Sequence, residues 1–168
     1  TGNTVIDALQ LVVNRIKNDE SLRLKIENTI FQSGFQELNS KFILVTGHRR
    51  ENFGQGFLNI CEALKVLAKN NPDISILYPV HLNPNVRGPV NELLSNVNNI
   101  KLVKPFQYEE FIYLMSKSYL ILTDSGGIQE EAPSLGRPVL VMRDTTERPE
   151  AVEAGTVKLV GSDQDNII

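Results

Sequence analysis

The fold is decided by the stretch Thr123-Asp124-Ser125-Gly126-Gly127-Ile128-Gln129-Glu130-Glu131-Ala132-Pro133. An apolar run over 119–122 leads into it and a helix-like segment leaves it, which predicts a strand, a tight turn and the start of a helix. Such a junction presents backbone N–H groups and the positive end of a helix dipole to an anion. The two glycines let an anion approach the backbone closely. We therefore expect this turn to hold a phosphate.

Apolar runs and helical periodicities alternate along the whole chain. Strands are predicted at 41–46, 74–80, 100–103, 119–123, 139–142 and 156–160. Helices are predicted at 4–18, 21–31, 56–69, 85–95, 108–116, from the turn to about 135, and as a short segment within 145–154. The alternation predicts an α/β fold, a Rossmann-like parallel sheet of about six strands with helices on both faces.

Ligands bind such sheets beyond the carboxyl ends of the strands, near a switch in strand order. The segments that follow the predicted strands carry the most chemically distinctive residues, namely His48, His81, Phe106, Ser125 and Arg148. This coincidence predicts a single site.

The composition is that of an ordinary globular protein of 168 residues, with 41% hydrophobic and 22% charged residues. A formal net charge of −3 gives no basic excess, so no nucleic-acid partner is expected. No apolar run reaches the roughly 20 residues that span a bilayer, and no membrane association is expected. The single cysteine, Cys61, excludes an internal disulfide framework and fits a reducing, cytoplasmic compartment.

The turn has two readings on the residues alone. The segment Ser125-Gly126-Gly127 is neither a Walker A loop nor GxGxxG, so a phosphate here would be held by backbone amides without a lysine. The same three residues also fit a plain strand-to-helix turn. Glu130 and Glu131 fit either acceptors for sugar hydroxyls or a solvated pair favoured by the helix dipole.

A second cluster, His48-Arg49-Arg50-Glu51, follows the strand at 41–46. Cations at a strand end suit an anionic ligand, and the arginine fork matches phosphate. His81 follows the next strand, and Arg148 lies in a charged loop that follows the strand at 139–142. Each of these two also fits an ordinary surface position.

The phenylalanines and the cysteine are weaker indications of a functional site. Phe106 and Phe111 fit either the core or the lining of a base site, and Cys61 is expected in the core. No metal site is expected, because the two histidines have no cysteine or carboxylate at metal-ligand spacing.

Four long motifs together resemble the non-hydrolysing bacterial UDP-N-acetylglucosamine 2-epimerase family. They are Gly47-His48-Arg49-Arg50-Glu51-Asn52, Tyr78-Pro79-Val80-His81-Leu82-Asn83-Pro84, the segment 122–133, and Val141-Met142-Arg143-Asp144-Thr145-Thr146-Glu147-Arg148-Pro149-Glu150. The opening Gly2-Asn3-Thr4-Val5-Ile6-Asp7 is also similar. The resemblance covers essentially the whole chain and is to the family's carboxyl-terminal domain, one half of a GT-B-type two-domain fold.

The resemblance implies an isomerase that interconverts UDP-N-acetylglucosamine and UDP-N-acetylmannosamine by eliminating UDP and adding it back with C2 inverted. It implies no cofactor, because this route needs no hydride carrier. By resemblance, Ser125, Gly126, Gly127 and Arg148 would hold the diphosphate, Glu131 the ribose and Phe111 the uracil. His48 would be the catalytic residue of this half, and Arg49 and His81 would touch an allosteric UDP-sugar.

The resemblance further implies an amino-terminal domain that carries the acidic residues for the C2 proton, closing helices that cross both domains, and a homodimer. The chain lacks an initiator methionine and ends where another helix starts, so we expect a fragment that is inactive alone. Three other readings remain open: the nucleotide-binding half of a retaining GT-B glycosyltransferase, a hydrolysing 2-epimerase, and a non-catalytic flavodoxin-like module.

Overall fold

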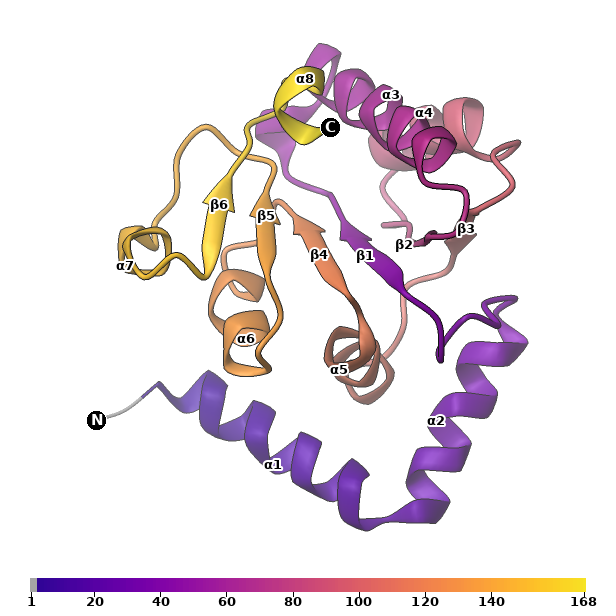
Figure 1. Ribbon diagram of the computed structural model, residues 1–168, viewed down its shortest axis with the longest axis vertical. Helices are drawn as coiled ribbons and strands as arrows, with labels where there is room; N and C mark the ends of the chain where they lie inside the picture. Colours follow the sequence, from indigo (N-terminus) through magenta and orange to yellow (C-terminus); the bar gives the residue numbers. More distant parts are fainter. Residues whose placement is uncertain (1–2) are drawn as a thin grey trace.

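A computed structural model describes residues 3–168 and shows one six-stranded sheet between two layers of helices (Figure 1). The strands are β1 (Phe42–Thr46), β2 (Ser75–Pro79), β3 (Ile100–Val103), β4 (Leu120–Thr123), β5 (Val139–Val141) and β6 (Val157–Leu159). All neighbouring pairs are parallel, in the order β3-β2-β1-β4-β5-β6. The predicted fold class is confirmed, and each strand lies within its predicted range.

The helices that the structure describes are α1 (Thr4–Asn18), α2 (Glu20–Gln32), α3 (Gln55–Asn70), α4 (Pro84–Leu94), α5 (Tyr108–Lys117), α6 (Ile128–Ser134), α7 (Pro149–Glu153) and α8 (Gln164–Ile167). A 3-10 turn, η1 (Arg50–Asn52), interrupts the loop after β1. At the start of α1, the side chain of Asn3 accepts a hydrogen bond from the Val5 N–H, as its residue type favours.

Side chains alternate between two hydrophobic layers because successive strand residues point to opposite faces. In β1, Phe42 and Leu44 pack with α1, α2, α5 and α6, whereas Val45 packs with α3, α4 and α8. Cys61 is fully buried in the second layer, and burial raises the pKa of its thiol to about 12. The core reading of this residue is confirmed.

Strand order reverses between β1 and β4, which are adjacent although 73 residues separate their ends along the chain, at Thr46 and Leu120. Thr46 and Thr123, the last residues of these strands, are register partners. The loops that leave β1 and β4 therefore emerge side by side, in the position where open parallel sheets bind ligands.

Candidate functional site

The turn after β4 is held in place by the strand ends. The hydroxyl oxygens of Thr46 and Thr123 lie 2.6 Å apart, and the Ser125 N–H donates to the Thr123 hydroxyl at 3.0 Å. Thr123 is fully buried and Thr46 partly buried, so this pairing of hydroxyls fixes the start of the turn.

Asp124 joins the loops after β1 and β4. Its side chain is fully buried, and its Oδ2 accepts the backbone N–H groups of His48 at 2.9 Å and Arg49 at 2.8 Å. Asn52 Nδ2 lies 3.4 Å from the same oxygen and also donates to the Met142 carbonyl at 3.1 Å, beyond β5. One buried carboxylate therefore sets the position of the His48-Arg49 backbone relative to the turn.

The turn formed by Ser125, Gly126 and Gly127, called the glycine turn below, has backbone N–H groups that can donate hydrogen bonds to a ligand. Among residues 3–168, no acceptor lies within hydrogen-bonding geometry of the Gly126 or Gly127 N–H. A Cβ added to Gly126 would lie 3.4 Å from Arg49 Nη2 and 3.7 Å from Glu147 Oε2. Two amides and a guanidinium thus share one surface, which suits an anion.

The adjacent carboxylates of α6 have different environments. Glu130 pairs with the Arg148 guanidinium and accepts from Asn3 Nδ2 at 3.1 Å. Glu131 accepts from the Tyr108 hydroxyl at 3.2 Å, and its Oε2 would lie 3.9 Å from a Cβ on Gly127. Burial raises the pKa of Glu131, against the opposing effect of the Tyr108 hydrogen bond. Of these two carboxylates of α6, Glu131 is therefore the one that faces the glycine turn.

Arg143, just beyond β5, is a buried cation with two carboxylate partners. Its Nε donates to Glu51 at 2.6 Å, and its Nη1 and Nη2 donate to Glu147 at 2.6 and 3.0 Å. The Glu147 hydrogen bonds, followed by those of Glu51, raise the pKa of Arg143 above its ordinary value. The same contacts lower the pKa of Glu147 to about 2. Glu147 therefore stays ionised, and it lies 3.5 Å from Arg49 Nη1.

The loop after β5 is tied to the turn through Gln129. This buried amide donates to the Ser125 carbonyl at 3.3 Å and accepts from the Thr146 hydroxyl. The Arg148 N–H in turn donates to the Thr146 hydroxyl at 3.0 Å. These bonds hold Arg148 beside α6, where its guanidinium meets Glu130.

The two histidines lie together beyond β1 and β2. Their rings stack with centroids 5.4 Å apart and planes inclined by 18°. His48 Nδ1 lies 3.5 Å from Asp124 Oδ1, and His81 Nδ1 accepts the Asn83 N–H at 3.1 Å. His48 thus lies against both the carboxylate that anchors the turn and His81, in the loop after β2.

Phe111 lies in the second turn of α5, partly buried against the first hydrophobic layer, and Phe106 packs against the same layer. The first turn of α5 reaches the site through Tyr108. Both phenylalanines are partly buried at the edge of this layer, which fits either interpretation, and a role of Phe111 at a base stays a prediction.

The predicted single site is assembled from distant segments. The structure brings His48, Arg49, His81, Ser125, Gly126, Gly127, Glu131 and Arg148 to one edge of the sheet. Sequence reasoning missed Asp124, Tyr108, Arg143 and Glu147. A carboxylate directly after a buried strand was the available signal for Asp124, whereas the others depend on loop packing that spacing does not reveal.

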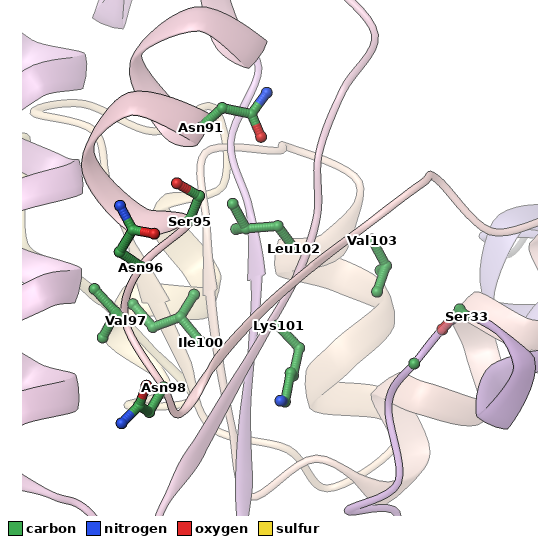
Figure 2. Close-up of a pocket in the computed structure, with 11 residues that line it drawn as sticks. Ser33, Asn91, Ser95, Asn96, Val97, Asn98, Ile100, Lys101, Leu102 and Val103 are labelled. Carbon is green, nitrogen blue, oxygen red and sulfur yellow. The ribbon is translucent and has the colours of Figure 1, made fainter.

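A surface depression of about 710 Å³ lies elsewhere (Figure 2). It runs along the edge strand β3 and the end of α4 and is lined mainly by asparagine, serine and aliphatic side chains. Lys101 is the only charged residue in its lining, among the residues described. It contains none of the predicted site residues and lacks the paired cations of the β1–β4 edge.

Residues 3–168 also lack two features that would bear on function. They contain no group of three or more histidine, cysteine, aspartate or glutamate side chains placed to hold a metal ion. Within the same residues, no helix has the length and apolar character needed to cross a membrane.

Comparison with known proteins gives matches over the full chain. The sequence model of one family, described as UDP-N-acetylglucosamine 2-epimerase, matches residues 1–168. A curated UDP-N-acetylglucosamine 2-epimerase of Campylobacter jejuni is 68% identical over 168 residues, which are 100% of this chain and 44% of the relative. The chain therefore spans less than half the length of the curated relatives it matches.

Solved structures give the same picture. The UDP-GlcNAc 2-epimerase of Neisseria meningitidis bound to UDP-GlcNAc is 58% identical, with a TM-score of 0.93 over 100% of this chain and 44% of that one. The Methanocaldococcus jannaschii UDP-GlcNAc 2-epimerase in complex with UDP-GlcNAc and UDP is 34% identical, with a TM-score of 0.82 over 99% of this chain and 45% of that one.

Proposed function

The chain belongs to the UDP-N-acetylglucosamine 2-epimerase family, and from this we propose that it is the carboxyl-terminal, UDP-binding domain of a non-hydrolysing 2-epimerase. In this proposal it forms one half of a GT-B-type fold. The complete enzyme interconverts UDP-N-acetylglucosamine and UDP-N-acetylmannosamine in the cytoplasm, by elimination and re-addition of UDP and without a cofactor.

One observation carries the proposal: the glycine turn at the β1–β4 switch point has two amides with no hydrogen-bond acceptor among residues 3–168, and it is faced by Arg49. The leaving group of the proposed reaction is a diphosphate, which develops charge as the C1–O bond breaks. Fixed amides and cations stabilise such charge without reorganising during the reaction.

The cations at this edge are already paired, and the exposed pairs are weak enough to be exchanged. Arg49 and Glu147 lie 3.5 Å apart with side chains 32% and 52% exposed. A pair of this kind contributes about 0–1 kcal/mol. A diphosphate entering between Gly126 and Arg49 replaces Glu147 as the partner of Arg49 at little cost.

The roles of the other residues in this proposal are those that the family resemblance implies. Ser125, Gly126, Gly127 and Arg148 hold the diphosphate, and Glu131, half-buried beside the turn, accepts the ribose hydroxyls. Phe111 lies near the uracil. His48 lies beside the phosphates and the reacting sugar and is the catalytic residue that this half supplies.

The proposed partners are a UDP-sugar substrate, an amino-terminal domain that supplies the acidic residues for the C2 proton, and a second copy of the enzyme in a homodimer. His81 stacks on His48, and Arg49 lies at the turn. A second UDP-sugar bound at Arg49 and His81 as an allosteric activator would therefore contact residues of the active site directly.

Calorimetric titration of this chain with UDP and with uridine tests the proposal. UDP is expected to bind more tightly than uridine, because uridine lacks the diphosphate. Arg148→Ala is expected to weaken UDP binding roughly tenfold or more, since a charge-assisted hydrogen bond contributes about 1.5–3 kcal/mol. Arg23→Ala, at a partly exposed position of α2 away from the glycine turn, is the control and leaves binding unchanged. Equal affinity for UDP and uridine would contradict the proposal.

A further inference from the structure

The two oxygens of the Asp124 carboxylate have different partners. Oδ2 accepts two backbone N–H groups and faces the Asn52 amide, which satisfies it fully. Oδ1 is also buried, yet no hydrogen bond reaches it from any of residues 3–168. The ring nitrogen Nδ1 of His48 lies 3.5 Å away.

A buried carboxylate oxygen without a donor is costly, and the cost falls when a neighbouring N–H turns toward it. The His48 side chain is 46% exposed, so its ring has room to rotate and close the 3.5 Å separation. Separations of this kind often shorten when a ligand binds.

We propose that Asp124 is a positioning residue: its Oδ1 keeps the proton of the neutral His48 imidazole on Nδ1 and so leaves Nε2 as the free nitrogen. A neutral imidazole carries one N–H, and the partner of one nitrogen decides the state of the other. When Nε2 takes a proton from solvent, both nitrogens donate, Nδ1 to Asp124 and Nε2 to an anion. The contact between Nε2 and an anion rests on the proposed function, whereas the tautomer of the His48 ring does not depend on it.

The second histidine provides an internal contrast. His81 Nδ1 accepts the Asn83 N–H, so the proton of a neutral His81 lies on Nε2. The chain has two histidines. The structure therefore assigns opposite tautomers to two stacked rings.

Nitrogen-15 NMR of the histidine rings in the wild-type chain tests this directly, at a pH about two units above the ordinary histidine value of ~6.5. One ring is expected to show a protonated Nδ1 and the other a protonated Nε2. His81→Gln assigns the signals, because the remaining ring is then His48. A wild-type His48 with its proton on Nε2 would overturn the proposal.

Two variants separate positioning from loop support. Asp124→Asn keeps the side-chain shape and offers its oxygen to the two backbone N–H groups, so its amide N–H₂ faces His48 Nδ1 and moves the ring proton to Nε2. Asn52→Ala removes a contact of the same loop but not the Oδ1 partner, and it leaves the tautomer of His48 unchanged. A folded Asp124→Asn chain with His48 still protonated on Nδ1 would overturn the proposal, and if this variant does not fold, the wild-type spectrum decides.

The UDP titration keeps this inference distinct from the proposed function. Wild-type tautomers as assigned, together with no UDP binding, leave the positioning role standing and contradict the function. UDP binding by a chain in which both rings carry the proton on Nε2 would support the proposed function and overturn the positioning role of Asp124.

Discussion

At the scale of single residues, Glu147 links the acid stability of the fold to the site. Hydrogen bonds from Arg143 lower the pKa of Glu147 from 4.5 to about 2. Because the folded protein releases this proton more readily than the unfolded chain, the pair contributes stability that is present above about pH 4.5 and lost as the pH falls through about 2.

The Glu147→Gln variant is therefore expected to be less stable than wild type at pH 6, and the difference is expected to shrink toward pH 2. Urea unfolding midpoints at several pH values measure it. Glu150→Gln is the matched control, since Glu150 is exposed on α7 and has no ion-pair partner among residues 3–168. A wild-type advantage over Glu147→Gln that is the same at pH 6 and pH 2 would show that the pair does not form.

A substitution at Gly126 tests whether the phosphate must approach the backbone of the turn closely. A Cβ at this position meets Arg49 at 3.4 Å, an ordinary contact, so Gly126→Ala is expected to fold with nearly wild-type stability. The methyl group nevertheless covers the free amides. UDP affinity is expected to fall roughly ten- to hundredfold, the equivalent of one lost charge-assisted hydrogen bond.

Calorimetry measures the loss, and Gly88→Ala is its control. A Cβ at Gly88, within α4, meets nothing within 4 Å, so that variant is expected to bind UDP like wild type. Equal UDP affinity of the two alanine variants would place the diphosphate away from the turn.

At the scale of elements, α1 packs on the rest of the domain through one apolar face. Leu9 is fully buried in the first hydrophobic layer, whereas Leu11, two residues later, is 72% exposed. Leu9→Ala is expected to lower the free energy of unfolding by about 2–5 kcal/mol. Leu11→Ala is expected to change it by less than about 0.5 kcal/mol. Denaturant titrations compare them, and equal losses would mean that α1 is not docked as the structure shows.

The sequence predicted most elements because long helices such as α1 and α3 have a clear helical periodicity, and because short, mainly apolar runs mark the strands. Asn3, for example, caps α1. The order of the strands was not predicted, because alternation of strands and helices fits several orders. Only the register of β1 with β4 reveals that His48 and Asp124 meet.

The candidate site was predicted from residues in loops that follow strands. The structure brings His48, His81, Ser125 and Arg148 to one edge of the sheet, whereas Phe106 packs against the first hydrophobic layer. The side-chain pairs around these residues were not predicted. They are the Arg143–Glu147 ion pair and the Tyr108–Glu131 hydrogen bond, and both depend on how the loops fold over the edge of the sheet. Nothing in the spacing of Arg143 shows that it is buried.

At the scale of the whole molecule, the site occupies one edge of one domain. The chain covers 44% of its Campylobacter relative, and the proposed bases for the C2 proton belong to another domain. The isolated chain is therefore expected to give no inversion at C2 of UDP-N-acetylglucosamine above the uncatalysed background. Proton NMR of the sugar follows the reaction, and formation of UDP-N-acetylmannosamine by this chain alone would contradict the domain assignment.

The proposed function depends above all on one contact, the binding of the UDP diphosphate by the glycine turn at the β1–β4 switch point. Titration of the nitrogen-15-labelled chain with UDP, followed through its backbone amides, tests this contact most directly. The largest shifts are expected at Ser125, Gly126 and Gly127, and uridine is expected to move them much less. Shifts centred on β3 and the depression beside it, or no shifts at the turn, would contradict it.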